Sequence, residues 1–143
     1  MAGKKEKIIQ TRLGERTVQT DKILTFPRGL IGLENHRRFA LLQIQEDSPF
    51  LVLQSLRNHK VGLLVADPYS FIDDYNVHVG KAEQKVLKLQ NIRQVAILVT
   101  VTIPSGEPEK TVLNLGGPIL VNYESRMGIQ VPQTDTSMPN HLY

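Results

Sequence analysis

Short runs rich in Val, Ile, Leu and Thr recur along the whole chain, and turn-forming residues separate them. The most apolar run covers residues 96–103, where every residue is apolar or β-branched. Many short runs at close spacing are typical of an antiparallel sandwich or barrel. The pattern therefore predicts a mainly β fold, a small antiparallel β-barrel-like single domain with one or two short helices. The run over 95–103 predicts a central strand that is buried on both faces.

The predicted strands cover residues 16–19, 23–25, 39–44, 50–54, 61–66, 75–79, 95–103, 110–115, 119–122 and 128–131. Gly, Pro, Asn and Asp stand between most of these segments, as expected of turns. Helical signals are few. Residues 33–38 suit one short helical turn, because the acidic residue comes first and the basic residues last. Residues 82–89 are the better helix candidate, because Val86 and Leu89 share one face there.

The chain has 143 residues, which suits one domain. We expect a flexible basic leader at residues 1–7, the β-barrel domain at 8–131 and a polar C-terminal tail at 132–143. The chain has no cysteine, which excludes disulfides and thiolate zinc sites. The first residues lack the apolar core of a signal peptide, and no run reaches the ~18 apolar residues of a membrane helix. These features predict a soluble, cytoplasmic protein that does not bind membranes.

The charge balance argues against a nucleic-acid-binding domain. The chain carries 17 basic and 14 acidic residues, a formal net charge of +3. Residues 1–7 hold three lysines and one glutamate, so the remaining body has a net charge of only +1. Domains that bind nucleic acid usually carry a clearly basic face. We therefore expect no direct contact with nucleic acid.

We find no residue pattern that predicts catalysis, a metal site or a cofactor. A Gly-x-Ser-x-Gly hydrolase elbow is absent. Ser55 and His59 are interpreted as solvent-facing turn residues. The four histidines lack the short spacing of zinc ligands. Gly29 and Gly32 are interpreted as turn residues that adopt φ values other residues disfavour. The sequence thus predicts a binding protein and not an enzyme.

The densest group of aromatic residues lies within an acidic segment. The candidate protein-binding residues there are Tyr69, Phe71, Asp73, Asp74 and Tyr75. Aromatic side chains are enriched at protein interfaces, and the acidic residues would repel nucleic-acid phosphates. In a second interpretation these residues only cap one end of the barrel, and Asp67 with Asp73 and Asp74 forms turns and a solvated loop. Both interpretations stay open.

An ordered series of segments supports a family assignment. These segments are FPRGLIGL at 26–33, FALL at 39–42, SPFLVLQS at 48–55, LLVADP at 63–68, Tyr75, LVTVTIP at 98–104, NL at 114–115 and PILVN at 118–122. In this order and spacing they resemble the FliW family, the bacterial flagellar assembly factors, from about residue 12 to 131. The leader lies outside the pattern, and residues 134–143 match it weakly. The motif residues, which either shape the barrel or contact a partner, are Phe26, Gly29, Gly32, Pro49, Phe50, Gln54, Ser55, Asn114, Pro118 and Asn122.

The resemblance implies a compact β-barrel-like fold and a role in translation regulation without a cofactor. FliW-like proteins bind the translational repressor CsrA and relieve its repression of flagellin translation. They also bind flagellin in a chaperone-like manner, so that the flagellin level controls flagellin synthesis. Such a switch needs either one shared surface or a coupling free energy between two sites, and the sequence leaves this choice open.

Two other functions are also considered. An RNA-binding β-barrel protein would use the basic leader with Arg28, Arg37 and Arg38. An enzyme would show a pocket with convergent polar groups.

Overall fold

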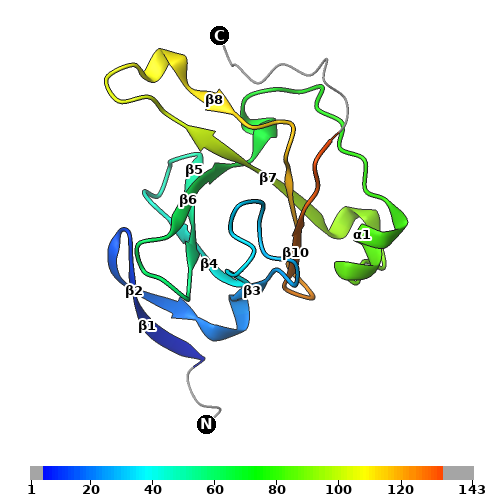
Figure 1. The fold of residues 1–143 in the computed structure, drawn as a ribbon, viewed down its shortest axis with the longest axis horizontal. Helices are drawn as coiled ribbons and strands as arrows, with labels where there is room; N and C mark the ends of the chain where they lie inside the picture. Colours follow the sequence, from blue (N-terminus) through cyan, green and yellow to red (C-terminus); the bar gives the residue numbers. More distant parts are fainter. Residues whose placement is uncertain (1–4, 134–143) are drawn as a thin grey trace.

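The structure is a computed structural model, and it describes residues 5–133 (Figure 1). It contains ten strands, one α-helix and four short 3₁₀ turns. The strands are β1 (Glu6–Thr11), β2 (Gly14–Gln19), β3 (Leu24–Thr25), β4 (Arg38–Gln43), β5 (Phe50–Ser55), β6 (Gly62–Ala66), β7 (Val95–Thr102), β8 (Val112–Leu113), β9 (Ile119–Asn122) and β10 (Met127–Gln130). Helix α1 is Lys81–Val86, and the 3₁₀ turns are Thr20–Lys22, Pro68–Ser70, Ile92–Gln94 and Pro108–Lys110.

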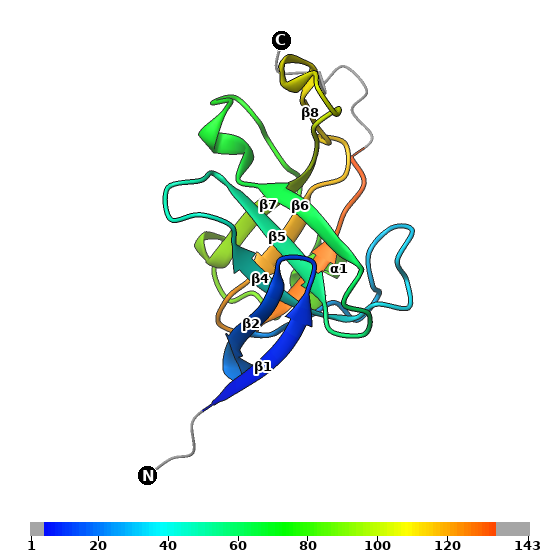
Figure 2. The ribbon, with the colours of Figure 1, turned by 90° about the vertical axis from the view of Figure 1, so that its left-hand side faces the viewer.

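Seven strands form a ring. Their order is β6-β5-β4-β3-β10-β9-β7, and a further pairing of β6 with β7 joins the two ends. All neighbours run antiparallel except β3 and β10, which are parallel through one residue pair. Strand β8 extends the sheet beyond β7. The hairpin of β1 and β2 is a separate two-stranded sheet, and Figure 2 shows it lying in front of β4 and β5. The expected fold, mainly β and a single domain, is confirmed.

Strands β4 and β5 are buried on both faces, which explains their largely apolar sequences. Phe39 and Leu53 face the interior of the ring, where the Phe26 and Phe39 rings meet edge to face at 5.4 Å. Ala40 and Val52 face the opposite side and pack against Val18 of the β1–β2 hairpin. Each such burial of a large apolar side chain stabilises the fold by about 1.5–3 kcal/mol. The hairpin therefore closes a second, smaller core on the outside of the ring.

Most predicted strands are confirmed, with boundaries shifted by a residue or two. The strand predicted at 75–79 is wrong, because this segment pairs with no strand. Of residues 110–115, only Val112–Leu113 is strand. The prediction missed β1, which begins at Glu6 within the expected leader. The central position of β7 is confirmed, but its burial is complete only at Leu98, Val99 and Val101.

The helical prediction for 33–38 is wrong. Gly29 and Gly32 have φ values of +66° and +82°, and a bridge between Leu30 and Leu33 closes a tight turn instead. The backbone then enters β4 at Arg38. The helix predicted at 82–89 is confirmed as α1, which ends at Val86 because Lys88 adopts a φ of +54°.

Candidate protein-binding surface

Five carboxylates gather at one end of strands β4, β5 and β6. Glu46 and Asp47 lie in the loop between β4 and β5, Asp67 follows β6, and Asp73 and Asp74 come shortly after it. Phe50 at the start of β5 pairs with Ala66 at the end of β6, so these loops lie at the same end of the sheet. Residues 45–50 and 67–76 contain no Lys or Arg. We call these five carboxylates the acidic end.

The aromatic candidates lie at the acidic end and differ in exposure. The Phe71 ring stacks on the Phe50 ring at 5.8 Å, and both rings are half-buried. Tyr69 is 42% exposed, and its hydroxyl donates a hydrogen bond to the Tyr75 carbonyl at 2.6 Å. The Asp67 carboxylate accepts the Tyr69 backbone N–H at 2.9 Å and so caps the turn Pro68–Ser70. The structure thus brings Tyr69, Phe71, Asp73 and Asp74 to one surface.

Tyr75 has a different environment from the other candidates. It is only 2% exposed, and its hydroxyl donates to the Leu115 carbonyl. Burial, and secondarily the neighbouring Tyr69, raises the pKa of Tyr75 to about 12. Tyr75 therefore fixes the segment that carries Asp73 and Asp74 to the body of the protein.

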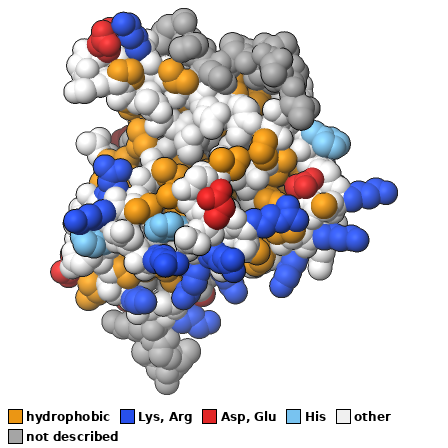
Figure 3. All heavy atoms as spheres, viewed as in Figure 1, with side chains coloured by type: hydrophobic (Ala, Val, Ile, Leu, Met, Phe, Trp, Pro, Cys, Tyr) orange, Lys and Arg blue, Asp and Glu red, His pale blue; other side chains and the backbone are white. Residues whose placement is uncertain are grey.

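The opposite end of the same strands is basic. Arg37 and Arg38 stand at the start of β4, and Arg57 and Lys60 lie in the loop between β5 and β6. Residues 35–38 and 56–60 contain no Asp or Glu. Strands of five or six residues are about 17–20 Å long, so the two charged ends are separated by roughly that distance. Lys and Arg side chains crowd the lower part of the face in Figure 3.

The motif residue Gln54 holds three parts of the chain together. It is fully buried, and its Oε1 accepts the Arg12 backbone N–H of the β1–β2 turn at 2.9 Å. Its Nε2 lies 3.0 to 3.1 Å from the carbonyls of Ser55, His59 and Val61. These contacts satisfy polar groups of the β5–β6 loop that would otherwise be buried without partners. The geometry explains the motif glutamine as a structural residue.

Ser55 departs from its expected place, while His59 is exposed as expected. Ser55 is buried, so the prediction of a solvent-facing residue is wrong for it. Its Oγ lies 2.7 Å from Nδ1 of His36 and accepts the backbone N–H groups of Arg57 and Asn58. Within residues 5–133, no carboxylate hydrogen bonds to His36, as an orienting acid in a catalytic triad would. The contact therefore orders the β5–β6 loop.

Several other motif residues also have visible structural roles. Asn122 is buried, its Nδ2 donates to the Leu87 carbonyl at 2.9 Å, and its Oδ1 accepts the Glu124 N–H at the β9–β10 turn. Pro118 is buried and its carbonyl accepts the Val131 N–H. Phe26 lies in the core. Pro49 and Asn114 are exposed.

Metal-binding geometry is absent from the part of the chain that the structure describes. No group of three or more His, Cys, Asp or Glu residues within 5–133 is arranged to hold a metal ion. His141 lies outside the described residues. Among those residues, no helix has the length and apolar character to span a membrane.

Comparison with known proteins identifies the family. Residues 7–142 match the sequence profile of FliW, described as "FliW protein". A flagellar assembly factor FliW of Nitratidesulfovibrio vulgaris is 60% identical over all of this chain and 83% of its own length. The FliW of Desulfovibrio desulfuricans is 51% identical over all of this chain and 87% of its own length.

A solved structure extends the likeness to the fold. A crystal structure of the flagellar assembly factor FliW superposes with a TM-score of 0.87 at 27% identity, covering 96% of this chain and 97% of the other. The ring of strands is therefore shared as well as the sequence motifs. This chain belongs to the FliW family of flagellar assembly factors.

Proposed function

We propose that this protein binds a CsrA-like translational repressor and, separately, flagellin, and that it couples the flagellin level to flagellin synthesis. Binding to the repressor relieves repression of flagellin translation, and flagellin displaces the repressor from this protein. The protein acts by stoichiometric binding in the cytoplasm and not by catalysis. Its membership of the FliW family over nearly the whole chain is the observation that carries the proposal.

The acidic end offers a surface suited to an RNA-binding partner. Five carboxylates in two segments that contain no Lys or Arg, residues 45–50 and 67–76, create a negative potential around Tyr69 and Phe71. Such a field attracts a basic protein surface, speeds its association and repels RNA phosphates from the complex. We therefore assign the repressor contact to Tyr69, Phe71, Asp73 and Asp74, with Tyr75 as their internal support.

Titration calorimetry tests this function. The protein is titrated with a CsrA-like protein alone and again with flagellin already bound. We expect micromolar or tighter binding that weakens when flagellin is present. Absence of binding to both proteins would refute the proposed function.

Charge reversal tests the assignment to the acidic end. The double variant Asp73→Lys with Asp74→Lys is compared with the double variant Glu15→Lys with Glu109→Lys, which changes the net charge equally at two exposed positions outside the acidic end. We expect the variant at Asp73 and Asp74 to bind the repressor at least tenfold more weakly, with a smaller dependence on salt, because complementary charges act in the encounter. Equal loss in the two variants would show that net charge matters and that the acidic end is not the contact.

The basic end favours a second candidate, direct RNA binding. Arg37, Arg38, Arg57 and Lys60 form a cationic group in the segments 35–38 and 56–60, which contain no Asp or Glu. RNA affinity at this end would fall steeply with salt as counterions are released, and Arg37→Glu with Arg38→Glu would abolish it. A salt-independent or undetectable RNA affinity in the full chain would refute RNA binding, and protein binding would then be the one remaining proposal.

A further inference from the structure

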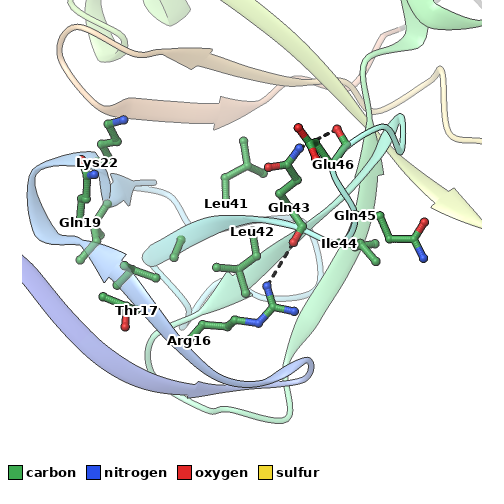
Figure 4. Close-up of a pocket in the computed structure, with 13 residues that line it drawn as sticks. Arg16, Thr17, Gln19, Lys22, Leu41, Leu42, Gln43, Ile44, Gln45 and Glu46 are labelled. Carbon is green, nitrogen blue, oxygen red and sulfur yellow. Dashed lines mark hydrogen bonds between the residues drawn. The ribbon is translucent and has the colours of Figure 1, made fainter.

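A groove is lined by residues of strands β2 and β4. After β2 the chain turns through Thr20–Lys22 into β3, which pairs with β4 only at Leu24–Phe39 and Thr25–Arg38. Beyond this junction, residues of β2 and β4 line a groove with a volume of about 660 Å³. Val18 of β2 packs against Ala40 and Leu42 of β4 beneath it. Figure 4 shows β2 and β4 on the two sides, with Arg16 reaching across. The junction near Lys22 is the closed end of the groove, and the Arg16 to Gln43 contact marks its open end.

The β4 edge that faces the groove has unused backbone groups. The Arg38 carbonyl accepts the Leu56 N–H on the β5 side, whereas the Arg37 carbonyl accepts the Phe26 N–H on the β3 side. Because the direction alternates along an antiparallel strand, Leu41 and Gln43 present their N–H and C=O groups to the groove. Within residues 5–133, the Gln43 carbonyl accepts a hydrogen bond from the Arg16 guanidinium at 3.2 Å, and the other three groups form no hydrogen bond with a turn, a loop or a side chain.

The β2 edge is open in the same way. The Thr20 N–H donates to the Lys5 carbonyl, so even-numbered residues of β2 bond to β1. Thr17 and Gln19 therefore direct their N–H and C=O groups away from β1, and both residues line the groove. Open edges of this kind are templates for an added strand. Two such edges bordering one groove indicate a strand-binding site more strongly than a single exposed edge strand does.

We propose that this groove binds an extended segment of a partner polypeptide, which adds as a strand antiparallel to β4. Main-chain hydrogen bonds to Leu41 and Gln43 supply affinity, and alternate side chains of the segment meet the partly exposed Leu41 and Ile44, which line the groove. Because β4 runs from the closed end toward the open end, the C-terminal part of the segment lies at the closed end. This inference goes beyond the proposed function, which assigns no role to the groove.

Charge complementarity specifies the occupant further. Lys22 lines the closed end, and within the described residues its ammonium group forms no ion pair. Arg126 and Lys22 also line a neighbouring cavity behind Leu41. The segment therefore carries apolar side chains at alternate positions and a carboxylate at its C-terminal end. The outer edge of β1 is a weaker template, because Glu6 and Lys7 lie on that exposed strand.

Amide hydrogen exchange measured by NMR tests the site without any natural partner. The probe is an acetylated hexapeptide of alternating threonine and valine with a final aspartate, at millimolar concentration. We expect the Leu41, Gln43 and Thr17 amides to exchange rapidly in the free protein and at least tenfold more slowly with the peptide. Replacing the final aspartate with lysine weakens binding severalfold.

Several outcomes would overturn the proposal. One is unchanged exchange at Leu41, Gln43 and Thr17. Another is slowing confined to the outer edge of β1. A third is slowing that appears without peptide and grows with protein concentration, which would mean that a second copy of the chain occupies the groove. Since the peptide is synthetic, these outcomes are independent of whether a CsrA-like protein or flagellin binds.

A proline–alanine pair supplies the matched variants. Gln43→Pro removes the N–H that faces the groove and keeps the β4–β5 ladder, because proline is tolerated where the N–H is unpaired. Gln43→Ala removes the same side chain and keeps the N–H. We expect the proline variant to bind the peptide about fivefold more weakly than the alanine variant, which corresponds to one ordinary hydrogen bond. Thr17→Pro and Thr17→Ala repeat the comparison on β2 if Gln43→Pro does not fold, and equal affinities within the folded pair would refute strand addition.

Discussion

Replacing Gln54 with glutamate tests whether this buried amide organises the fold. Glutamate keeps the oxygen that accepts the Arg12 N–H but replaces Nε2, which faces the carbonyls of Ser55, His59 and Val61, with a second oxygen. At neutral pH a buried negative charge would then face three carbonyl oxygens. The substitution changes no volume, so its effect reports on hydrogen bonding and charge alone.

The expected loss of stability is large. A buried charge that is left without a partner destabilises a protein by about 3–5 kcal/mol. For a domain of this size the melting temperature would fall by about 10 °C or more. Burial against three carbonyl oxygens would raise the pKa of the new carboxyl in the folded state above its unfolded value near 4.3. A raised pKa in the folded state means that the penalty is absent below about pH 4.3 and grows as the pH rises toward about 8.

Thermal unfolding followed by circular dichroism between pH 4 and pH 8 measures this penalty. The control is Gln45→Glu, which adds the same charge at an exposed loop position. The difference in melting temperature between the two variants should be large at pH 8 and shrink toward pH 4. A Gln54→Glu protein that melts within 3 °C of the control at pH 8 would show that the Gln54 amide is not essential to the fold.

Two further substitutions probe other parts of the fold. Gly29→Ala should destabilise the protein by at least 2 kcal/mol in chemical unfolding, since its Cβ would lie 2.6 Å from the Glu34 backbone at a φ of +66°. The control Gly106→Ala, also at positive φ but in open space, should cost only about 1 kcal/mol. Equal costs in the two variants would contradict the steric argument. Between pH 10 and pH 12 the wild-type free energy of unfolding should fall, because the raised pKa of Tyr75 lets the folded state keep a proton that the unfolded state loses. In Tyr75→Phe this fall should be smaller. An equal fall in both proteins would mean that other tyrosines dominate.

The strands were predictable where local sequence and burial agree. Residues 50–54 and 119–122 are mostly apolar, bounded by turn residues and largely buried, so their pattern predicts them directly. Strand β1 was missed because most of its residues are exposed and, within residues 5–133, it pairs with β2 alone, which leaves little apolar signal. The segment 75–79 reads as a strand because of its β-branched residues, yet Tyr75 anchors it through a hydroxyl and not through a ladder. Tertiary contacts override local preference there.

The candidate surface was predictable only in part. The acidic and aromatic residues of 67–75 are visible in the sequence, but their proximity to Glu46 and Asp47 depends on the pairing of β5 with β6. The structural role of Gln54 depends on contacts with residues up to 42 positions away. The groove has no sequence signature, because an open edge arises where two strands stop pairing. The one hint is the shortness of β3, because two residues cannot pair with the whole edge of the six-residue strand β4.

The groove and the acidic end share one residue, and this bears on how two ligands could exclude each other. Glu46 belongs to the acidic end and also lines the open end of the groove. A polypeptide that fills the groove to its open end therefore reaches the surface where the acidic end begins. Ligands of these two surfaces would exclude each other by steric overlap at Glu46. Mutual displacement then requires no conformational change of the ring, whose buried strands β4 and β5 lie beneath both surfaces.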